Sequence, residues 1–180
     1  MEAMIFAAGL GTRLQPITNS IPKALVKING VCLLQHCIEN LIKQGCTKIV
    51  VNIHHFGEQI ITFLNTNKFD VDVDIAISDE RDCLLDTGGG LKKAEHFFDK
   101  KNPILIHNVD IISSIDLQKL YTTHCQSNAL ATLAVADRKT SRYLLFDRHN
   151  NLAGWTNRKT DETIWASPKQ KDNVVPMAFS

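Results

Sequence analysis

A run of glycines and cations near the amino terminus holds the first groups in this sequence that could do chemistry. Gly9 and Gly11 follow the apolar segment 3–8 directly, and Arg13 and Lys23 come next. Glycine lets a backbone approach an anion with no Cβ in the way, and amide hydrogens freed in such a loop form an anion-binding concavity. A guanidinium fork suits phosphate oxygens, and a lysine adds a compact second charge. The stretch therefore predicts a local phosphate site.

Two familiar glycine motifs do not fit this run. The dinucleotide fingerprint requires glycine or alanine at its last position, where this chain has Leu14. The loop of nucleoside triphosphatases requires Gly-Lys followed by Ser or Thr, which the chain does not contain. A plain strand-to-loop turn, with Arg13 and Lys23 in solvent, is the simpler alternative, and Gly-Leu-Gly alone would favour it. The whole run to Lys23 favours a site, and a dinucleotide-dependent oxidoreductase is a more distant alternative.

The same run resembles the signature of sugar-1-phosphate nucleotidyltransferases, in particular the muramate-1-phosphate uridylyltransferases and mannose-1-phosphate guanylyltransferases. The matching residues are Gly9-Leu10-Gly11-Thr12-Arg13-Leu14, Pro16, Thr18, Pro22 and Lys23. The resemblance implies a loop that wraps a nucleoside triphosphate. It implies that Arg13 contacts the phosphates and that Lys23 bridges the nucleotide α-phosphate and a sugar phosphate. The nucleotide-binding residues expected in this loop are Ala7, Ala8, Gly9, Gly11, Thr12 and Arg13.

A second cluster, Asp86-Thr87-Gly88-Gly89-Gly90-Leu91, contains more glycine than a helix start needs. Its plain interpretation is a helix N-terminus capped by Asp86 or Thr87, although each glycine costs helix stability. Close backbone approach to a flat ligand would explain the excess. The resemblance implies that Thr87 and Gly88 read the nucleotide base, mainly through backbone groups, and makes Asn52 a weaker candidate neighbour of the base.

Asp110, which follows the apolar segment 104–109, is the candidate metal ligand. Taken alone, a carboxylate in this place is more typical of a loop cap. Mg²⁺ prefers hard oxygen ligands and often binds through one or two carboxylates plus substrate phosphates. The resemblance maps Asp110 onto the metal-binding aspartate of the family, although Val109 stands where glycine is usual.

A second metal ligand is not evident in the sequence. The family uses a further aspartate in its sugar-binding half, but Asp161, Glu162 and Asp172 lie in a polar segment without the expected apolar strand. His54 and His55 are adjacent on a strand end, so their side chains should point to opposite faces, and we assign neither as a ligand. The missing aspartate leaves open a second hypothesis, a nucleotide-binding module without catalysis.

The elements that must position these residues alternate between strand and helix. The strand-like segments are 3–7, 48–53, 71–77, 103–107 and 130–135, and the helical ones are 33–42, 60–64, 88–98 and 116–125. Asn29-Gly30 marks a turn, and Gly45 lies where the helix 33–42 should stop. This order predicts an α/β fold with a Rossmann-like, mostly parallel central sheet flanked by helices. The resemblance implies the nucleotide-diphospho-sugar transferase type. Ligands of such sheets bind beyond the carboxyl ends of the strands, where Gly9, His54 and Asp110 fall.

At 180 residues the chain suits one nucleotidyltransferase domain. We place a nucleotide-binding core at about 1–136 and the start of a sugar-binding part at 137–180. The latter has short strands broken at Asn150-Asn151 and a polar, loop-like stretch over 156–173. Its last residues, 174–180, are typical of the beginning of a buried strand, so we expect the domain to be incomplete at its carboxyl end.

Composition and charge exclude several classes of binding partner. The formal charge of +1 gives no broad positive field for nucleic acid or anionic lipid. The apolar segment 3–8 is too short to span a membrane and lacks a basic leader. Five scattered cysteines without a CxxC pair are typical of core residues in a reducing cytosol, so we expect a cytoplasmic protein. The sequence does not indicate an oligomeric state.

The resemblance implies transfer of a nucleoside monophosphate from a nucleoside triphosphate to a sugar 1-phosphate, with release of pyrophosphate. The catalytic residues would be Arg13, Lys23 and Asp110, with Mg²⁺ as the cofactor. The Thr-Gly-Gly-Gly form favours UTP, with GTP next.

Overall fold

The structure, a computed structural model, describes residues 1–69, 73–167 and 174–179. They form two compact units, Met1–Asn128 and Ala129–Ser180, and each unit has its own sheet. Among the described residues, no helix combines the length and the apolar character needed to cross a membrane.

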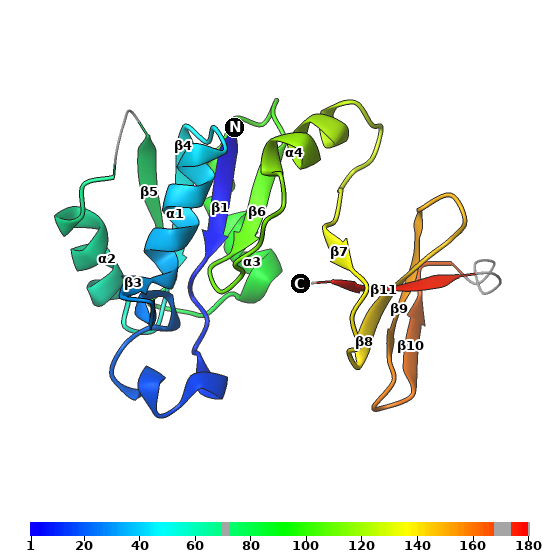
Figure 1. Cartoon of the computed structure of the whole chain (residues 1–180), viewed down its shortest axis with the longest axis horizontal. Helices are drawn as coiled ribbons and strands as arrows, with labels where there is room; N and C mark the ends of the chain where they lie inside the picture. The colour runs from blue at the N-terminus through cyan, green and yellow to red at the C-terminus, as the bar shows by residue number, and fades with distance from the viewer. Residues whose placement is uncertain (70–72, 168–173, 180) are drawn as a thin grey trace. The chain divides into compact units, whose positions relative to one another are not determined.

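The first unit is built on a parallel sheet with the strand order β5-β4-β1-β6 (Figure 1). Its strands are β1 (Glu2–Phe6), β4 (Lys48–Ile53), β5 (Asp74–Asp79) and β6 (Ile104–Asn108). The central strands are almost continuously apolar and buried, as a parallel sheet covered on both faces requires. The predicted bounds of β4 are confirmed.

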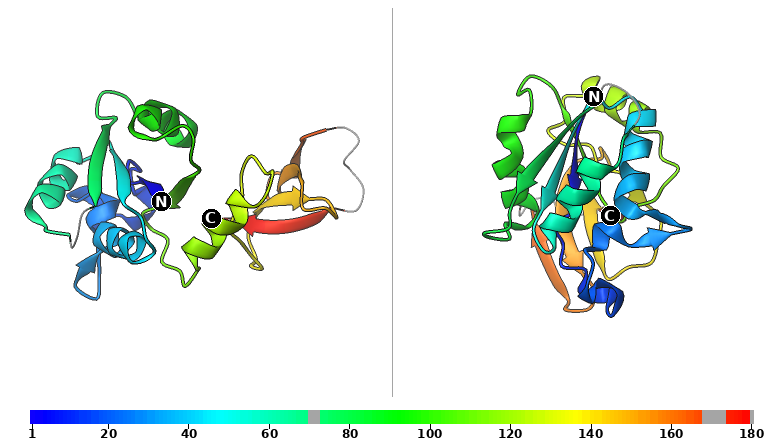
Figure 2. Two further views of the ribbon diagram at one scale, coloured as in Figure 1. Left: turned by 90° about the horizontal axis from the view of Figure 1, so that it is seen from above. Right: turned by 90° about the vertical axis from the view of Figure 1, so that its left-hand side faces the viewer.

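Helices cover both faces of this sheet (Figure 2). They are α1 (Leu33–Lys43), α2 (Gly57–Thr66), α3 (Asp86–Ala94) and α4 (Leu117–Cys125). Apolar side chains of α1, α2 and α4 pack with Ile5 and Val51 on one face, whereas Ala94 of α3 packs with Met4 and Val50 on the other. The predicted α/β class, a Rossmann-like parallel sheet between helices, is confirmed.

The strand order creates a crevice at the carboxyl ends of β1 and β6, where sheets of this kind bind ligands. β4 and β5 lie on one side of β1 and β6 lies on the other, so the connections that leave β1 and β6 diverge at their carboxyl ends. The long segment after β1 is more regular than the predicted loop, since it contains 3-10 turns at Thr12–Leu14, Ile17–Asn19 and Lys23–Leu25. It ends in the hairpin β2 (Lys27–Ile28) and β3 (Val31–Cys32).

The turn predicted at Asn29-Gly30 joins this hairpin. Both residues have positive φ, 52° and 86°, as a two-residue hairpin turn that matches the strand twist requires. The helix stop predicted at Gly45 also has a positive φ, 87°, and its amide donates to the Ile42 carbonyl oxygen.

The second unit is an antiparallel sheet with the strand order β10-β9-β8-β11-β7. Its strands are β7 (Val135–Ala136), β8 (Arg142–Phe146), β9 (Leu152–Asn157), β10 (Glu162–Trp165) and β11 (Val175–Phe179). Tyr143, Leu145, Ala153 and Ala178 are its buried side chains among the described residues. The Arg158 guanidinium lies 4.5 Å from the centre of the Tyr143 ring, a cation–π contact.

Three sequence predictions about regular structure are wrong in detail. The strand expected at 130–135 is reduced to β7, because Leu130 and Leu133 are exposed instead of packed in a core. The loop expected over 156–173 contains the end of β9 and all of β10, while residues 168–173 lie outside the described part. The strand expected from 71 begins at Asp74, and residues 71 and 72 likewise lie outside that part.

The assignment of all five cysteines to a core is also wrong. Cys32, Cys37 and Cys46 are buried, whereas Cys83 and Cys125 are exposed. A small apolar side chain is tolerated at a surface position, so type alone did not reveal which cysteines the helices and sheet would cover.

Candidate active site

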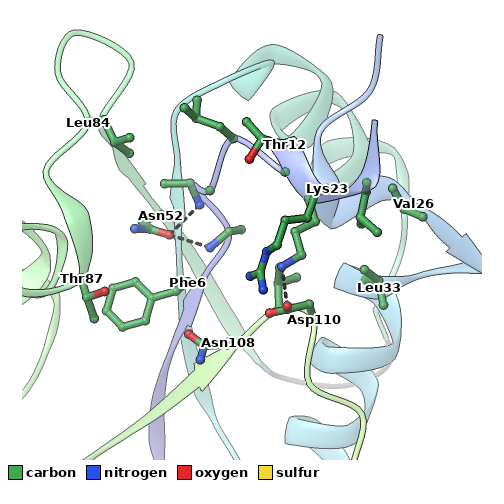
Figure 3. A pocket seen from close by; sticks show the side chains of 18 of the residues that line it. Phe6, Thr12, Lys23, Val26, Leu33, Asn52, Leu84, Thr87, Asn108 and Asp110 are labelled. Carbon is green, nitrogen blue, oxygen red and sulfur yellow. Dashed lines mark hydrogen bonds and ion pairs between the residues drawn. The ribbon is translucent and has the colours of Figure 1, made fainter. Parts of the chain in front are cut away.

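A pocket of about 860 Å³ lies at the carboxyl ends of β1 and β6 (Figure 3). The structure brings nearly all of the predicted site residues to its wall, namely Ala7, Ala8, Gly9, Gly11, Thr12, Arg13, Lys23, Asn52, Thr87 and Asp110. Gly88 is the exception, since it lines a separate cavity beside α3 with Leu91 and Lys92. Residues far apart in the sequence therefore share one hollow of the first unit.

The two glycines of the loop after β1 serve different purposes. Gly11 has a φ of 67°, and a Cβ there would lie 3.0 Å from Thr18 Cγ2 and 3.1 Å from Lys23 Cβ. The Thr18 hydroxyl donates to the Gly11 carbonyl oxygen at 2.8 Å. Gly11 therefore lets the loop fold back onto Lys23. A Cβ at Gly9 would meet no atom within 4 Å, so that backbone is open to a ligand.

The amide hydrogens of this loop divide into two groups. Those of Ala7 and Ala8 donate to Asn52 Oδ1, at 2.7 Å and 3.2 Å, as the dashed lines in Figure 3 mark. Among the described residues, no hydrogen bond uses the amides of 9–13. Successive unused amides on a glycine turn form a concavity for an anion. The amides of 9–13 are therefore available to an anion, whereas those of Ala7 and Ala8 anchor the loop.

Lys23 and Asp110 form an ion pair in the pocket, 87 residues apart in sequence. Lys23 begins a 3-10 turn after Pro22, and Asp110 lies two residues beyond β6. Val109, which replaces the expected glycine, is 3% exposed and packs in the core while its amide donates to the Phe6 carbonyl oxygen at 3.2 Å. The replacement therefore leaves the Asp110 carboxylate at the pocket, beside a positive charge.

In the part of the chain that the structure describes, the Asp110 carboxylate does not belong to a cluster of metal-binding side chains. Within the described residues, no three His, Cys, Asp or Glu side chains are grouped so as to hold a metal ion. A cation bound to Asp110 would take its remaining ligands from water and from an anion on the 9–13 amides. That is the ligand pattern that Mg²⁺ favours, because it keeps several waters and uses few carboxylates.

Apolar and amide side chains that the sequence reasoning missed complete the pocket wall. They are Phe6, Val26, Ile28, Leu33, Leu84 and Asn108. Phe6 and Asn108 are register partners on β1 and β6, so the side-chain alternation of these strands places both on the face that also carries Asn52. That alternation was the available signal. Figure 3 shows Leu84 and Thr87 at the other end of the pocket from Lys23 and Asp110.

The glycine-rich start of α3 is not a side-chain cap. The N-cap position is Leu85, no side chain caps the helix, and Asp86 has a φ of 55°. The capping interpretation of Asp86 or Thr87 is therefore wrong. Two of the three glycines are required by packing, since a Cβ at Gly90 would lie 2.6 Å from Glu80 Oε1 and one at Gly89 would lie 2.9 Å from Leu85 Cβ.

His107 lies in the core under the pocket and not in its wall. Its Nδ1 is 2.8 Å from the Asn108 carbonyl oxygen and 3.2 Å from Cys37 Sγ. Burial lowers the pKa of His107 from its usual 6.5, and burial together with nearby Cys46 raises the pKa of the Cys37 thiol to about 12. Both groups are therefore neutral at pH 7 and support the fold beneath Asp110.

Comparison with known proteins identifies the family. Residues 2–147 match the nucleotidyl transferase family. The chain is 40% identical over 111 residues to the N-acetylmuramate alpha-1-phosphate uridylyltransferase of Caulobacter vibrioides, a match that covers 61% of this chain and 46% of that protein. It is 36% identical over 134 residues to the mannose-1-phosphate guanyltransferase of Pichia angusta, covering 74% of this chain and 36% of that protein.

A solved structure shares the fold. HddC from Yersinia pseudotuberculosis, complexed with GMP-PN, superimposes with a TM-score of 0.73 at 19% identity over 99% of this chain and 88% of that one. The chain spans less than half the length of the two curated relatives named above. Since the family match covers most of the described first unit and continues into the second, the chain belongs to the nucleotidyl transferase family.

Proposed function

We propose that this chain carries the triphosphate-binding and metal-binding part of a sugar-1-phosphate nucleotidyltransferase. The reaction transfers a nucleoside monophosphate from a nucleoside triphosphate to a sugar 1-phosphate and releases pyrophosphate. The observation that carries this proposal is the meeting of Lys23 and Asp110 in the pocket that the free 9–13 amides also line. A polyphosphate with its metal ion requires an anion site, a cation and a carboxylate within one hollow, and this pocket supplies all three.

The chemistry needs no nucleophilic side chain. An oxygen of the sugar phosphate attacks the α-phosphorus, a new P–O bond forms, and the bond to the β-phosphate breaks with its electron pair leaving on pyrophosphate. Two anions must approach each other, so positioning and charge neutralisation supply most of the rate. Under this proposal Arg13 and the 9–13 amides hold the triphosphate, and Lys23 neutralises both the α-phosphate and the incoming phosphate.

Asp110 is the residue that would hold Mg²⁺. Its carboxylate already accepts a positive partner, the Lys23 ammonium, and its side chain is 36% exposed at the pocket, which leaves room for water and phosphate ligands. When bound, the metal ion supplies further charge neutralisation on the phosphate oxygens. In the loaded site the Lys23 ammonium is then free for the phosphates.

The Thr87-Gly88-Gly89-Gly90 form favours uridylyl transfer, with guanylyl transfer next. The relatives named above support these two bases without ranking them, because one is a uridylyltransferase and the other a guanyltransferase. Thr87 and Leu84 lie at the end of the pocket away from Lys23, which leaves that end for the base.

The test is a panel of four nucleoside triphosphates with Mg²⁺, in which binding is measured by calorimetry and pyrophosphate release is measured with several sugar 1-phosphates. We expect UTP to bind to this chain, and we expect pyrophosphate release with at least one sugar phosphate from a protein that spans the length of the relatives named above. In that longer protein, Lys23→Ala and Asp110→Ala should each lower turnover by at least about a hundredfold. Lys101→Ala and Asp82→Asn, which change exposed residues outside the pocket, are the matched controls.

The competing function, a nucleotide-binding module, predicts a different result from the same panel. Triphosphate binding without pyrophosphate release for any sugar phosphate, even in a protein that spans the length of those relatives, would favour the module. Absence of triphosphate binding would reject both functions.

A further inference from the structure

We propose that Glu80 is a positioning residue that holds the phosphate loop, residues 7–13, and the base segment, residues 84–91, in one fixed arrangement. This inference rests on the proposed function for its meaning, but the contacts that carry it belong to the fold. Glu80 follows β5 and is fully buried, with 0% exposure. No ion pair among the described residues includes it. A carboxyl group in such a place is retained only with good hydrogen bonds.

The first of these hydrogen bonds sets the orientation of Asn52. Asn52 Nδ2 donates to Glu80 Oε1 at 2.8 Å, which turns Oδ1 of the same amide toward the amides of Ala7 and Ala8. A side-chain amide has a donor end and an acceptor end. If the amide were flipped, its NH₂ group would face two backbone N–H donors and its oxygen would face the carboxyl group. Glu80 therefore holds Asn52 in the orientation that anchors the phosphate loop.

The second hydrogen bond reaches the base segment. The amide of Leu85 donates to Glu80 Oε2 at 3.3 Å, and Leu85 lies next to Leu84 in the pocket wall and two residues before Thr87. One oxygen of Glu80 thus serves the phosphate end of the pocket and the other serves the base end. A displacement of either segment therefore alters a hydrogen bond of the same carboxyl group.

Gly90 gives independent support. A Cβ at Gly90 would lie 2.6 Å from Glu80 Oε1 and 3.1 Å from Asn52 Nδ2, so the third glycine of the run makes room for this hydrogen bond. A glycine inside a helix costs stability relative to alanine. The chain therefore has a residue that stabilises a helix poorly at the position where the Glu80–Asn52 hydrogen bond needs space.

Glu80→Gln tests the role directly. Glutamine has one acceptor and one donor end, so it can serve Asn52 or Leu85 but not both. In the ligand-free chain we expect the Ala7 and Ala8 amides to exchange with solvent faster, by about tenfold, and their NMR resonances to shift. Dissociation constants for Mg-UTP and Mg-GTP should rise by a similar factor of about ten, because the loop grips phosphate and not the base.

Three further substitutions serve as a backup, a control and a test of the connection through Asn52. Gly90→Ala should reproduce the loop signature without changing any charge, and it replaces Glu80→Gln if that variant does not fold. Glu58→Gln, an exposed acid paired with Arg81, is the control and should leave the Ala7 and Ala8 amides unchanged. In an Asn52→Ala background, Glu80→Gln should add little to the exchange at Ala7 and Ala8, because the connection runs through Asn52.

Several outcomes would overturn the inference. They are unchanged exchange at Ala7 and Ala8 in both Glu80→Gln and Gly90→Ala, an equal change in Glu58→Gln, or a loss of affinity confined to one base. The last would make Glu80 a base-reading residue. If the unmodified chain bound no triphosphate, the proposed function would fail, while the exchange comparison would still decide the positioning role.

Discussion

Substitution of Gly11 by alanine gives a stability effect that can be worked out from the loop geometry. At a φ of 67° an L-residue costs about 1–2 kcal/mol. The new Cβ would also lie 3.0 Å from Thr18 Cγ2 and 3.1 Å from Lys23 Cβ, and such crowding adds about 1–3 kcal/mol. The loss of unfolded-state freedom offsets about 0.4–1 kcal/mol. Gly11→Ala should therefore lower the free energy of unfolding by about 1–4.6 kcal/mol, with a central value of about 3 kcal/mol.

Two other glycines are matched controls for the separate contributions. Gly30 has a φ of 86° and open space around its missing Cβ, so Gly30→Ala should show the backbone cost alone, about 1 kcal/mol. Gly9 has neither positive φ nor a near neighbour, so Gly9→Ala should leave stability within about 0.5 kcal/mol. Because the Gly9 backbone is open to the pocket, the same variant should weaken triphosphate binding.

The assay is urea unfolding followed by far-UV circular dichroism. All four described α-helices lie in the first unit, so the helical signal reports on the unit that contains the loop. The reasoning is refuted if Gly11→Ala costs no more than Gly30→Ala, since the contacts with Thr18 and Lys23 would then have no energetic weight.

Three further predictions follow from burial and capping. Because burial lowers the pKa of His107 below its usual 6.5, the unfolded chain binds the proton more readily; unfolding free energy should fall as pH drops below about 6.5, and His107→Gln should flatten that dependence in urea melts. In the native chain a thiol reagent should label Cys83 and Cys125 quickly, while Cys37, buried and with a pKa of about 12, should react only after urea is added; mass spectrometry of labelled peptides decides this. Asp116 accepts a hydrogen bond from the Lys119 amide at 2.8 Å, so Asp116→Ala should cost about 1 kcal/mol of unfolding free energy, and an unchanged melt would reject the cap.

Much of the fold could be predicted because local pattern and tertiary structure agree in the first unit. The apolar segment 48–53 predicted β4 with its observed bounds. Asn29-Gly30 predicted the hairpin turn, because few other residues adopt positive φ at both positions. In the second unit the same reasoning failed at 130–135, because apolar residues there are exposed and only tertiary packing decides whether such a segment becomes a strand.

The candidate site was predictable in its residues but not in its hydrogen bonds. The spacing of Gly9, Gly11 and Lys23 indicated a phosphate loop, and the strand ends brought Asp110 to the same crevice. The sequence pattern could not show that the amides of Ala7 and Ala8 donate to Asn52. It also could not show that Glu80 leaves no room for a Cβ at Gly90. Those facts depend on which side chains from distant strands meet, and nothing in the local sequence carries that information.

The most direct test of the phosphate grip is calorimetric titration of UTP into the unmodified chain, with and without Mg²⁺, and into Lys23→Ala, Asp110→Ala and the control Lys101→Ala. We expect Mg²⁺ to tighten UTP binding to the unmodified chain and to Lys101→Ala by about tenfold. Asp110→Ala should lose that gain. Lys23→Ala should bind UTP about tenfold more weakly, with and without Mg²⁺. UTP affinity that is the same in all four proteins, with the same response to Mg²⁺, would contradict the account.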